Sequence, residues 1–138
     1  MSKTAQTFPL LKYALIGDAI ASGGTGLLMA AGAGFLGDLL GLSVSLLTYA
    51  GLFLLPYAAA VAFVGTRKAI NRRAVWPIVI LNLLWVVDSF VLLASLEPAP
   101  TIFGVVFVAF QAVVVLAFAV AQAIGLRQQK NSAEFMTA

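Results

Sequence analysis

The sequence predicts an all-α membrane protein, with four transmembrane helices in an antiparallel up-and-down bundle. Of its 138 residues, 62% are hydrophobic and only 9% are charged, whereas soluble domains contain about 25% charged residues. Four apolar segments are each long enough to cross a hydrocarbon core, which is about 30 Å thick and needs about 20 helical residues. We therefore expect one four-helix transmembrane domain that comprises residues 1–138.

The first two helices are expected at about 13–34 and 44–64. The first apolar run is longer than the 7–15-residue core of a signal peptide, and further spans follow it, so it is retained as a helix. The connection at 34–43 carries Asp38 and is expected to rest at the membrane interface. Ser43 is suited to cap the second helix. Pro56 lies near the middle of that helix, where proline usually produces a kink.

The third and fourth helices are expected at about 74–96 and 102–126. Between them, the segment EPAPT at 97–101 contains two prolines and interrupts the apolar pattern. A polar tail follows the fourth helix.

The basic residues predict the orientation of the bundle. All eight lysines and arginines lie in the N-terminal segment, the connection between helices two and three, or the C-terminal segment. The other two connections contain only Asp38 and Glu97. By the positive-inside rule, both termini are expected to be cytoplasmic, where the basic residues meet anionic lipid headgroups.

The composition also excludes several classes of chemistry. The chain contains no cysteine and no histidine, so disulfides, thiolate or imidazole metal sites and histidine-ligated haem are ruled out. The five acidic residues are widely scattered, and we expect no metal and no cofactor. Because the basic residues occupy loops between apolar spans, we expect a lipid bilayer and no nucleic acid as the partner.

Polar residues within the third helix mark a candidate intramembrane site. A carboxylate inside a span costs about 2.5–3.5 kcal/mol on insertion scales, so Asp88 is expected to point into the bundle. Gln111 on the fourth helix lies at a similar depth and is its expected hydrogen-bond partner. The predicted binding site consists of Asn82, Trp85, Asp88, Ser89 and Gln111.

The first helix carries a second polar residue and a packing surface. Asp18 lies at a similar depth to Gln122 of the fourth helix, and the two are expected to form a structural polar pair. Ser22, Gly26 and Ala30 are spaced four residues apart. Small residues at that spacing let two helices approach closely, which favours packing over ligand binding for this face.

The segments LLPYA, LNLLWVVDS and FVAFQA, with GLR at the end of the fourth helix, resemble those of small bacterial four-span proteins usually described only as integral membrane proteins. The resemblance covers nearly the whole chain. It implies a four-span fold in a bacterial inner membrane and carries no activity with it.

Three function classes are open from the sequence. The first is a non-catalytic accessory or scaffold protein that packs against itself or within a larger membrane complex. The second is a small transporter, dimeric and proton-coupled, or a protein that binds a solute or lipid around Asp88. An intramembrane enzyme is the least favoured class, because only Ser89 beside Asp88 offers any of the groups that catalysis requires.

Overall fold

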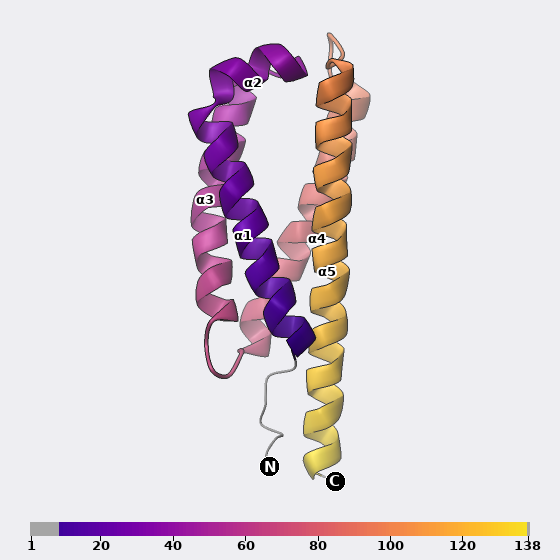
Figure 1. Cartoon of the computed structure of the whole chain (residues 1–138). Coiled ribbons are helices and arrows are strands. Elements are labelled where there is room, and N and C mark those ends of the chain that lie inside the picture. Colours follow the sequence, from indigo (N-terminus) through magenta and orange to yellow (C-terminus); the bar gives the residue numbers. More distant parts are fainter. Residues whose placement is uncertain (1–8, 138) are drawn as a thin grey trace.

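A computed structural model describes the backbone of residues 9–137 and the side chains of residues 10–128 (Figure 1). The described residues form α-helices and no strands. In chain order the helices are α1 (Pro9–Ala31), α2 (Ala33–Leu40), α3 (Val44–Gly65), α4 (Arg72–Ser95) and α5 (Ile102–Thr137). Four of them, all except α2, are long and apolar enough to cross a membrane, which confirms the predicted all-α fold with four candidate transmembrane helices.

The connection at 34–43 is more ordered than the sequence indicates. The chain bends at Gly32, so α1 ends at Ala31, and the next eight residues form α2. α2 forms because Leu36 and Leu40 share one face of a short helix and are buried there. Asp38 lies on the exposed side. Gly41 follows the last residue of α2 and caps it, with a φ of 71° that glycine adopts without steric cost.

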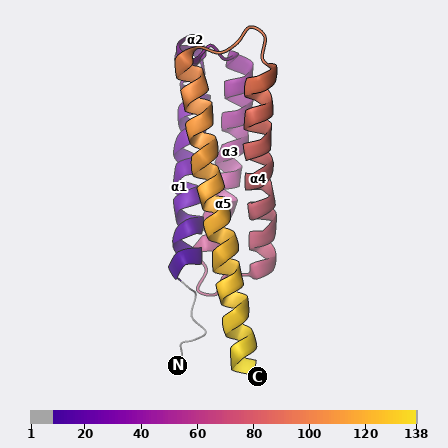
Figure 2. The ribbon, with the colours of Figure 1, turned by 90° about the vertical axis from the view of Figure 1, so that its right-hand side faces the viewer.

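The limits of the long helices largely follow the expected ones. The side chain of Ser43 accepts a hydrogen bond of 3.0 Å from the backbone N–H of Leu46, which confirms the predicted cap of α3. The exception is α5, which was expected to end near residue 126 but remains helical to Thr137. Figure 2 shows this helix projecting beyond the other helices at the end of the bundle where it finishes.

The four long helices are arranged as two pairs. α1 packs along α3, α4 packs along α5, and α1 also contacts α5, whereas the backbones of α3 and α4 approach each other at only a few positions. Within the first pair, Gly26 and Ala30 of α1 lie directly against Gly51 of α3. A Cβ atom added at Gly51 would stand 2.6 Å from the backbone nitrogen of Ala30. This approach between two backbones requires a residue without a side chain.

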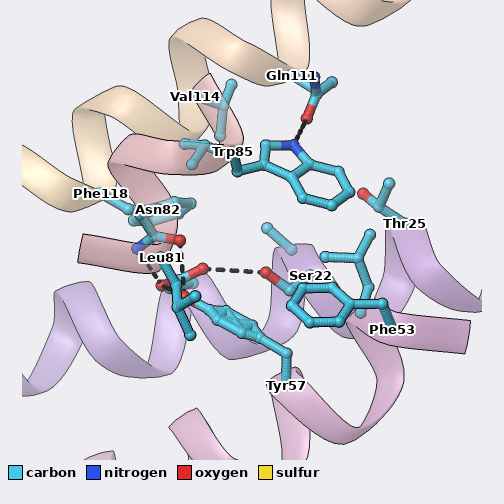
Figure 3. A pocket seen from close by; sticks show the side chains of 14 residues that line it. Ser22, Thr25, Phe53, Tyr57, Leu81, Asn82, Trp85, Gln111, Val114 and Phe118 are labelled. Atoms are coloured by element: carbon cyan, nitrogen blue, oxygen red, sulfur yellow. Dashed lines mark hydrogen bonds between the residues drawn. The ribbon is translucent and has the colours of Figure 1, made fainter. Parts of the chain in front are cut away.

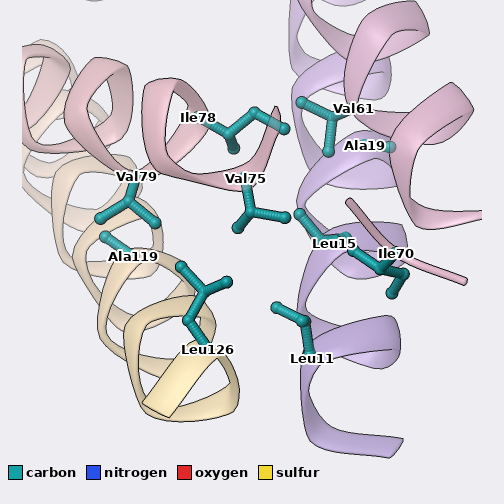
Figure 4. Packing of buried hydrophobic residues seen from close by; sticks show 10 residues of the cluster. All are labelled: Leu11, Leu15, Ala19, Val61, Ile70, Val75, Ile78, Val79, Ala119 and Leu126. Carbon is teal, nitrogen blue, oxygen red and sulfur yellow. The ribbon is translucent and has the colours of Figure 1, made fainter. Parts of the chain in front are cut away.

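Two hydrophobic clusters fill the two ends of the bundle. The cluster at the end where α1 begins joins α1, α3, α4 and α5, as Figure 4 shows around Leu15, Val75 and Leu126. The cluster at the α2 end is formed mainly by α1, α2 and α3 with Val108 of α5. α4 adds only partly buried side chains there. The helix pairs are therefore held together firmly at one end and more loosely at the other.

Hydrogen bonds join neighbouring helices at both ends of the bundle. At one end, the Lys12 ammonium donates to the carbonyl of Gly65 at the C-terminus of α3 (3.1 Å), where a cation is favoured by the helix dipole. At the α2 end, the backbone N–H of Thr101 donates to the carbonyl of Leu40 (3.0 Å), and its hydroxyl donates to the carbonyl of Leu39 (2.8 Å). We call this second contact the α2–α5 clasp.

Candidate functional site

The most buried acidic residue in the described chain is Asp18, which is 1% exposed. Its partners come from all four long helices: Ser22 on α1, Tyr57 on α3, Asn82 on α4 and Gln122 on α5. Figure 3 shows the first three of these partners. We call these five residues the Asp18 network.

The polar side-chain atoms of the Asp18 network form hydrogen bonds with one another. One carboxylate oxygen accepts from the Ser22 hydroxyl (3.0 Å), and the other accepts from the amide nitrogens of Asn82 and Gln122 (2.8 Å each). The Tyr57 hydroxyl lies 3.1 Å from that second oxygen and 2.6 Å from the amide oxygen of Asn82. The Asn82 amide also donates to Gln122 (3.1 Å). Such a fully bonded group fixes the relative positions of the helices.

The structure brings Asp18 and Gln122 together, at the depth where the sequence places both. It also assigns Asn82 to this network, whereas the sequence grouped Asn82 with Asp88. Sequence reasoning did not place Tyr57 here, and it assigned Ser22 only to helix packing. Two signals point to these residues: the hydroxyl of a tyrosine beside Pro56 needs a partner inside the membrane, and Ser22 follows Asp18 by one helical turn.

A second polar cluster lies one to two turns nearer the α2 end. The indole N–H of Trp85 donates to the side-chain oxygen of Gln111 (2.6 Å). The Gln111 amide nitrogen donates to the Ser89 hydroxyl (3.0 Å) and to the carbonyl of Val108 (2.9 Å), and Ser89 donates to the carbonyl of Trp85 (2.7 Å). Each of these side chains has its hydrogen-bonding capacity used, and the Trp85 ring is thereby fixed in orientation.

The expectation that Asp88 points into the bundle and bonds Gln111 is wrong. Asp88 is exposed, and it makes no hydrogen bond or ion pair with any described residue. There are two physical reasons. The buried stripe of α4 contains Asn82, Val86 and Ser89, and at 100° per residue Asp88 lies about 120° round the helix from Asn82, outside that stripe. Both amide hydrogens of Gln111 are also already donated elsewhere.

Asp88 instead lines a groove between the helix pairs. The groove has a volume of about 220 Å³, which is more than ten times what one water molecule needs. It includes Trp85, Ser89 and Gln111 of the predicted site. Its other walls are apolar and come from α1, the α2–α3 connection, α3, α4 and α5: Met29, Leu42, Leu46, Leu47, Ala50, Leu92, Phe107 and Val108. We call this the Asp88 groove.

A smaller cavity of about 50 Å³ continues from the groove toward the Asp18 network. The two spaces share Trp85 and Gln111. Figure 3 shows the cavity with Trp85 and Gln111 on one side and Tyr57 and Asn82 on the other. Phe53 stacks on both Trp85 and Tyr57, with ring centroids 6.3 and 6.2 Å apart. Three aromatic rings therefore line the space between the Asp18 network and the Asp88 groove.

Pro56 lies inside α3 and faces a third, almost entirely apolar cleft between α3 and α4, which Pro77 also lines. The described residues contain no group of three acidic side chains placed to hold a metal ion.

Comparison of the chain with protein-family models, with curated proteins and with solved structures finds no match. The arrangement of the site itself must therefore carry any functional conclusion.

Proposed function

We propose that this protein is a small, non-catalytic integral membrane protein of a bacterial inner membrane that binds a lipophilic molecule in the Asp88 groove. The observation that carries this proposal is the groove itself. It is a space of about 220 Å³ between two helix pairs, walled by apolar side chains, with a tryptophan held in place by Gln111. Ligand sites typically combine such an apolar lining with a few fixed polar groups.

Ser89 does not support a catalytic role. Its hydroxyl donates to the carbonyl of its own helix at Trp85 and accepts from Gln111. A nucleophile instead needs a general base within hydrogen-bonding reach. The groove is therefore better suited to binding than to bond cleavage.

Trp85 provides a direct test of the proposal. The chain contains two tryptophans, so Trp76→Phe leaves Trp85 as the only indole reporter. Single-chain amphiphiles with a bromine at the end of the alkyl chain quench nearby indoles. Titration of such a series into the purified protein in nanodiscs should give saturable quenching of Trp85.

Two alanines on α3 provide a matched control. Ala50 lines the groove, whereas Ala59 is exposed and lines none of the cavities described above. Ala50→Phe, or the smaller Ala50→Leu if the first variant does not fold, should remove the saturable quenching. Ala59→Phe should retain it. Quenching that stays linear in amphiphile concentration, or equal loss in both variants, would overturn the proposal.

A second candidate is the accessory or scaffold role, in which the chain packs against itself or another membrane protein. The observation that favours it is α5, which continues as a helix to Thr137 and projects beyond the other helices at that end of the bundle (Figure 2). A helix that leaves the membrane intact offers a surface for a partner. Removing residues 129–138 should then dissociate an oligomer or complex in light-scattering measurements. An unchanged mass would count against this role.

The proposed orientation, with both termini in the cytoplasm, rests on the distribution of basic residues. Ala69 and Ala99 are both exposed and lie in connections at opposite ends of the bundle. We predict that Ala69→Cys is shielded from a membrane-impermeant thiol reagent added to intact cells, whereas Ala99→Cys reacts. The parent chain has no cysteine, which makes the background negligible. The reverse pattern of labelling would show that both termini lie outside the cytoplasm.

A further inference from the structure

The Asp88 groove has an unbalanced charge. Asp88 is the only ionisable residue among those that line it, and none of them is lysine or arginine. Asp88 lies seven residues before the end of α4 at Ser95, which is about 10 Å along the helix axis. Asp88 is thus placed well inside a candidate span, at the edge of a largely apolar space.

No described part of the protein compensates this charge. The other polar side chains of the groove, Ser89 and Gln111, direct their hydrogens to one another and to backbone carbonyls. By contrast, the buried carboxylate of Asp18 in the same bundle is stabilised by hydrogen bonds from four side chains. An intramembrane carboxylate is normally paired or hydrogen-bonded, so the missing partner of Asp88 is expected to come from the ligand.

We propose that the Asp88 groove binds a single-chain cationic amphiphile, with its ammonium group against Asp88 and its alkyl chain along the apolar walls. This inference rests on the proposed function and specifies its ligand class. The ammonium supplies the charge that the groove lacks. Trp85 and Phe107 line the same space, and aromatic faces also attract cations.

The charge distribution argues against a phospholipid as the occupant. A zwitterionic lipid would bring a phosphate close to its ammonium, and the lining residues contain no basic side chain to receive it. The basic side chains that the structure describes lie on α1, on the α3–α4 connection, at the start of α4 and near the end of the α5 span: Lys12, Arg67, Lys68, Arg72, Arg73 and Arg127. The groove therefore suits a cation without a phosphate.

The inner cavity extends the space available to the alkyl chain. It begins at Trp85 and Gln111, which it shares with the groove, and continues past Phe53, Val115 and Phe118. An alkyl chain that follows this path points toward the middle of the bilayer. The cationic head then remains about 10 Å from the end of α4, beside Asp88.

The experiment uses the Trp85 reporter with four amphiphiles that share one brominated alkyl chain. Their head groups are a trimethylammonium, a neutral hydroxyl, a sulfate and a zwitterionic phosphocholine. We expect the trimethylammonium compound to give the tightest saturable quenching. Asp88→Asn should weaken its binding about tenfold, the effect of losing one charge-assisted contact, and leave the neutral compound unchanged. Asp88→Glu should retain most of the affinity.

Asp38→Asn is the matched control, because it removes an exposed carboxylate at the same end of the bundle but outside the groove. It should leave all four affinities unchanged. Equal binding of the neutral and cationic compounds, tightest binding of the phosphocholine, or no effect of Asp88→Asn would overturn the assigned ligand class while leaving the groove as a lipophilic site. Absence of saturable quenching with every head group would overturn the proposed function as well.

Discussion

Asp18 and Asp88 are carboxylates within candidate spans of the same bundle, yet their surroundings differ completely. Asp18 is buried among donors from all four long helices, whereas Asp88 is exposed in a groove and bonds to no described residue. The difference follows from how the helix pairs meet. Where the pairs are in contact, polar groups find one another. Where the pairs separate, a polar group has no hydrogen-bond partner among the described residues.

We expect the largest loss of stability when Asp18 is replaced. Asp18→Leu removes four hydrogen bonds and leaves buried amides with fewer partners. At about 0.6 kcal/mol for each membrane hydrogen bond plus the cost of the stranded groups, we expect a loss of about 3 kcal/mol of unfolding free energy. Unfolding by a denaturing detergent in mixed micelles measures it. A loss below about 1 kcal/mol would show that the network is not a structural element.

A somewhat smaller effect is expected at Gly26, where α1 and α3 approach closely. A Cβ atom there would meet the Cβ of Leu54 at 2.8 Å and the carbonyl oxygen of Gly51 at 2.9 Å. Gly26→Leu should therefore cost about 2 kcal/mol, within the usual range for overpacking, and lower the melting temperature in detergent. Gly24→Leu is the control, because a Cβ atom at Gly24 meets no other atom within 4 Å. Equal melting temperatures would show that α1 and α3 separate at little cost.

Gln111 tests how much the hydrogen bonds beside the groove contribute to stability. Gln111→Leu removes the partner of the Trp85 indole and one partner of Ser89. We expect a loss of about 1 kcal/mol from two membrane hydrogen bonds. The freed indole should also show lower fluorescence anisotropy in the Trp76→Phe background. Unchanged anisotropy would mean that packing against Phe53 alone fixes the ring.

The smallest effect on stability is expected at Asp88. Asp88→Leu removes a carboxylate that makes no described contact and replaces it with an apolar side chain in a span. The unfolding free energy should change by less than about 0.5 kcal/mol or increase. Together with Asp18→Leu, this variant tests the central comparison directly. A loss comparable to that of Asp18→Leu would show that Asp88 has a structural partner.

The sequence predicts the four spans well, because apolar length depends on composition alone. The sequence is less informative about the contacts of the polar residues. The spacing of residues shows which side chains share a face of a helix, but it does not show which neighbouring helix that face contacts. Asn82 and Ser89 do share the buried face of α4, yet they join different clusters. Asp88 could not be placed from the sequence, because α4 is apolar on all sides and its sequence does not reveal which face is buried against the other helices.

α2 and its contact with the start of α5 were missed for a related reason. α2 is too short to form a stable helix alone, and it gains stability from burying Leu36 and Leu40 against the rest of the bundle. The α2–α5 clasp depends on Thr101 reaching backbone carbonyls 61 and 62 residues earlier in the chain. Contacts over such separations leave no pattern in the local sequence.

The Asp18 network has a consequence for biosynthesis. The partners of Asp18 are made in the order Ser22, Tyr57, Asn82 and Gln122, one on each successive long helix. When the first helix leaves the ribosome, only Ser22 is present to bond the carboxylate. Each later helix that inserts removes part of the cost of keeping Asp18 in hydrocarbon, and Gln122 removes the last of it. The carboxylate of Asp18 therefore disfavours membrane insertion of the first helix on its own. The final position of that helix depends on completion of the chain.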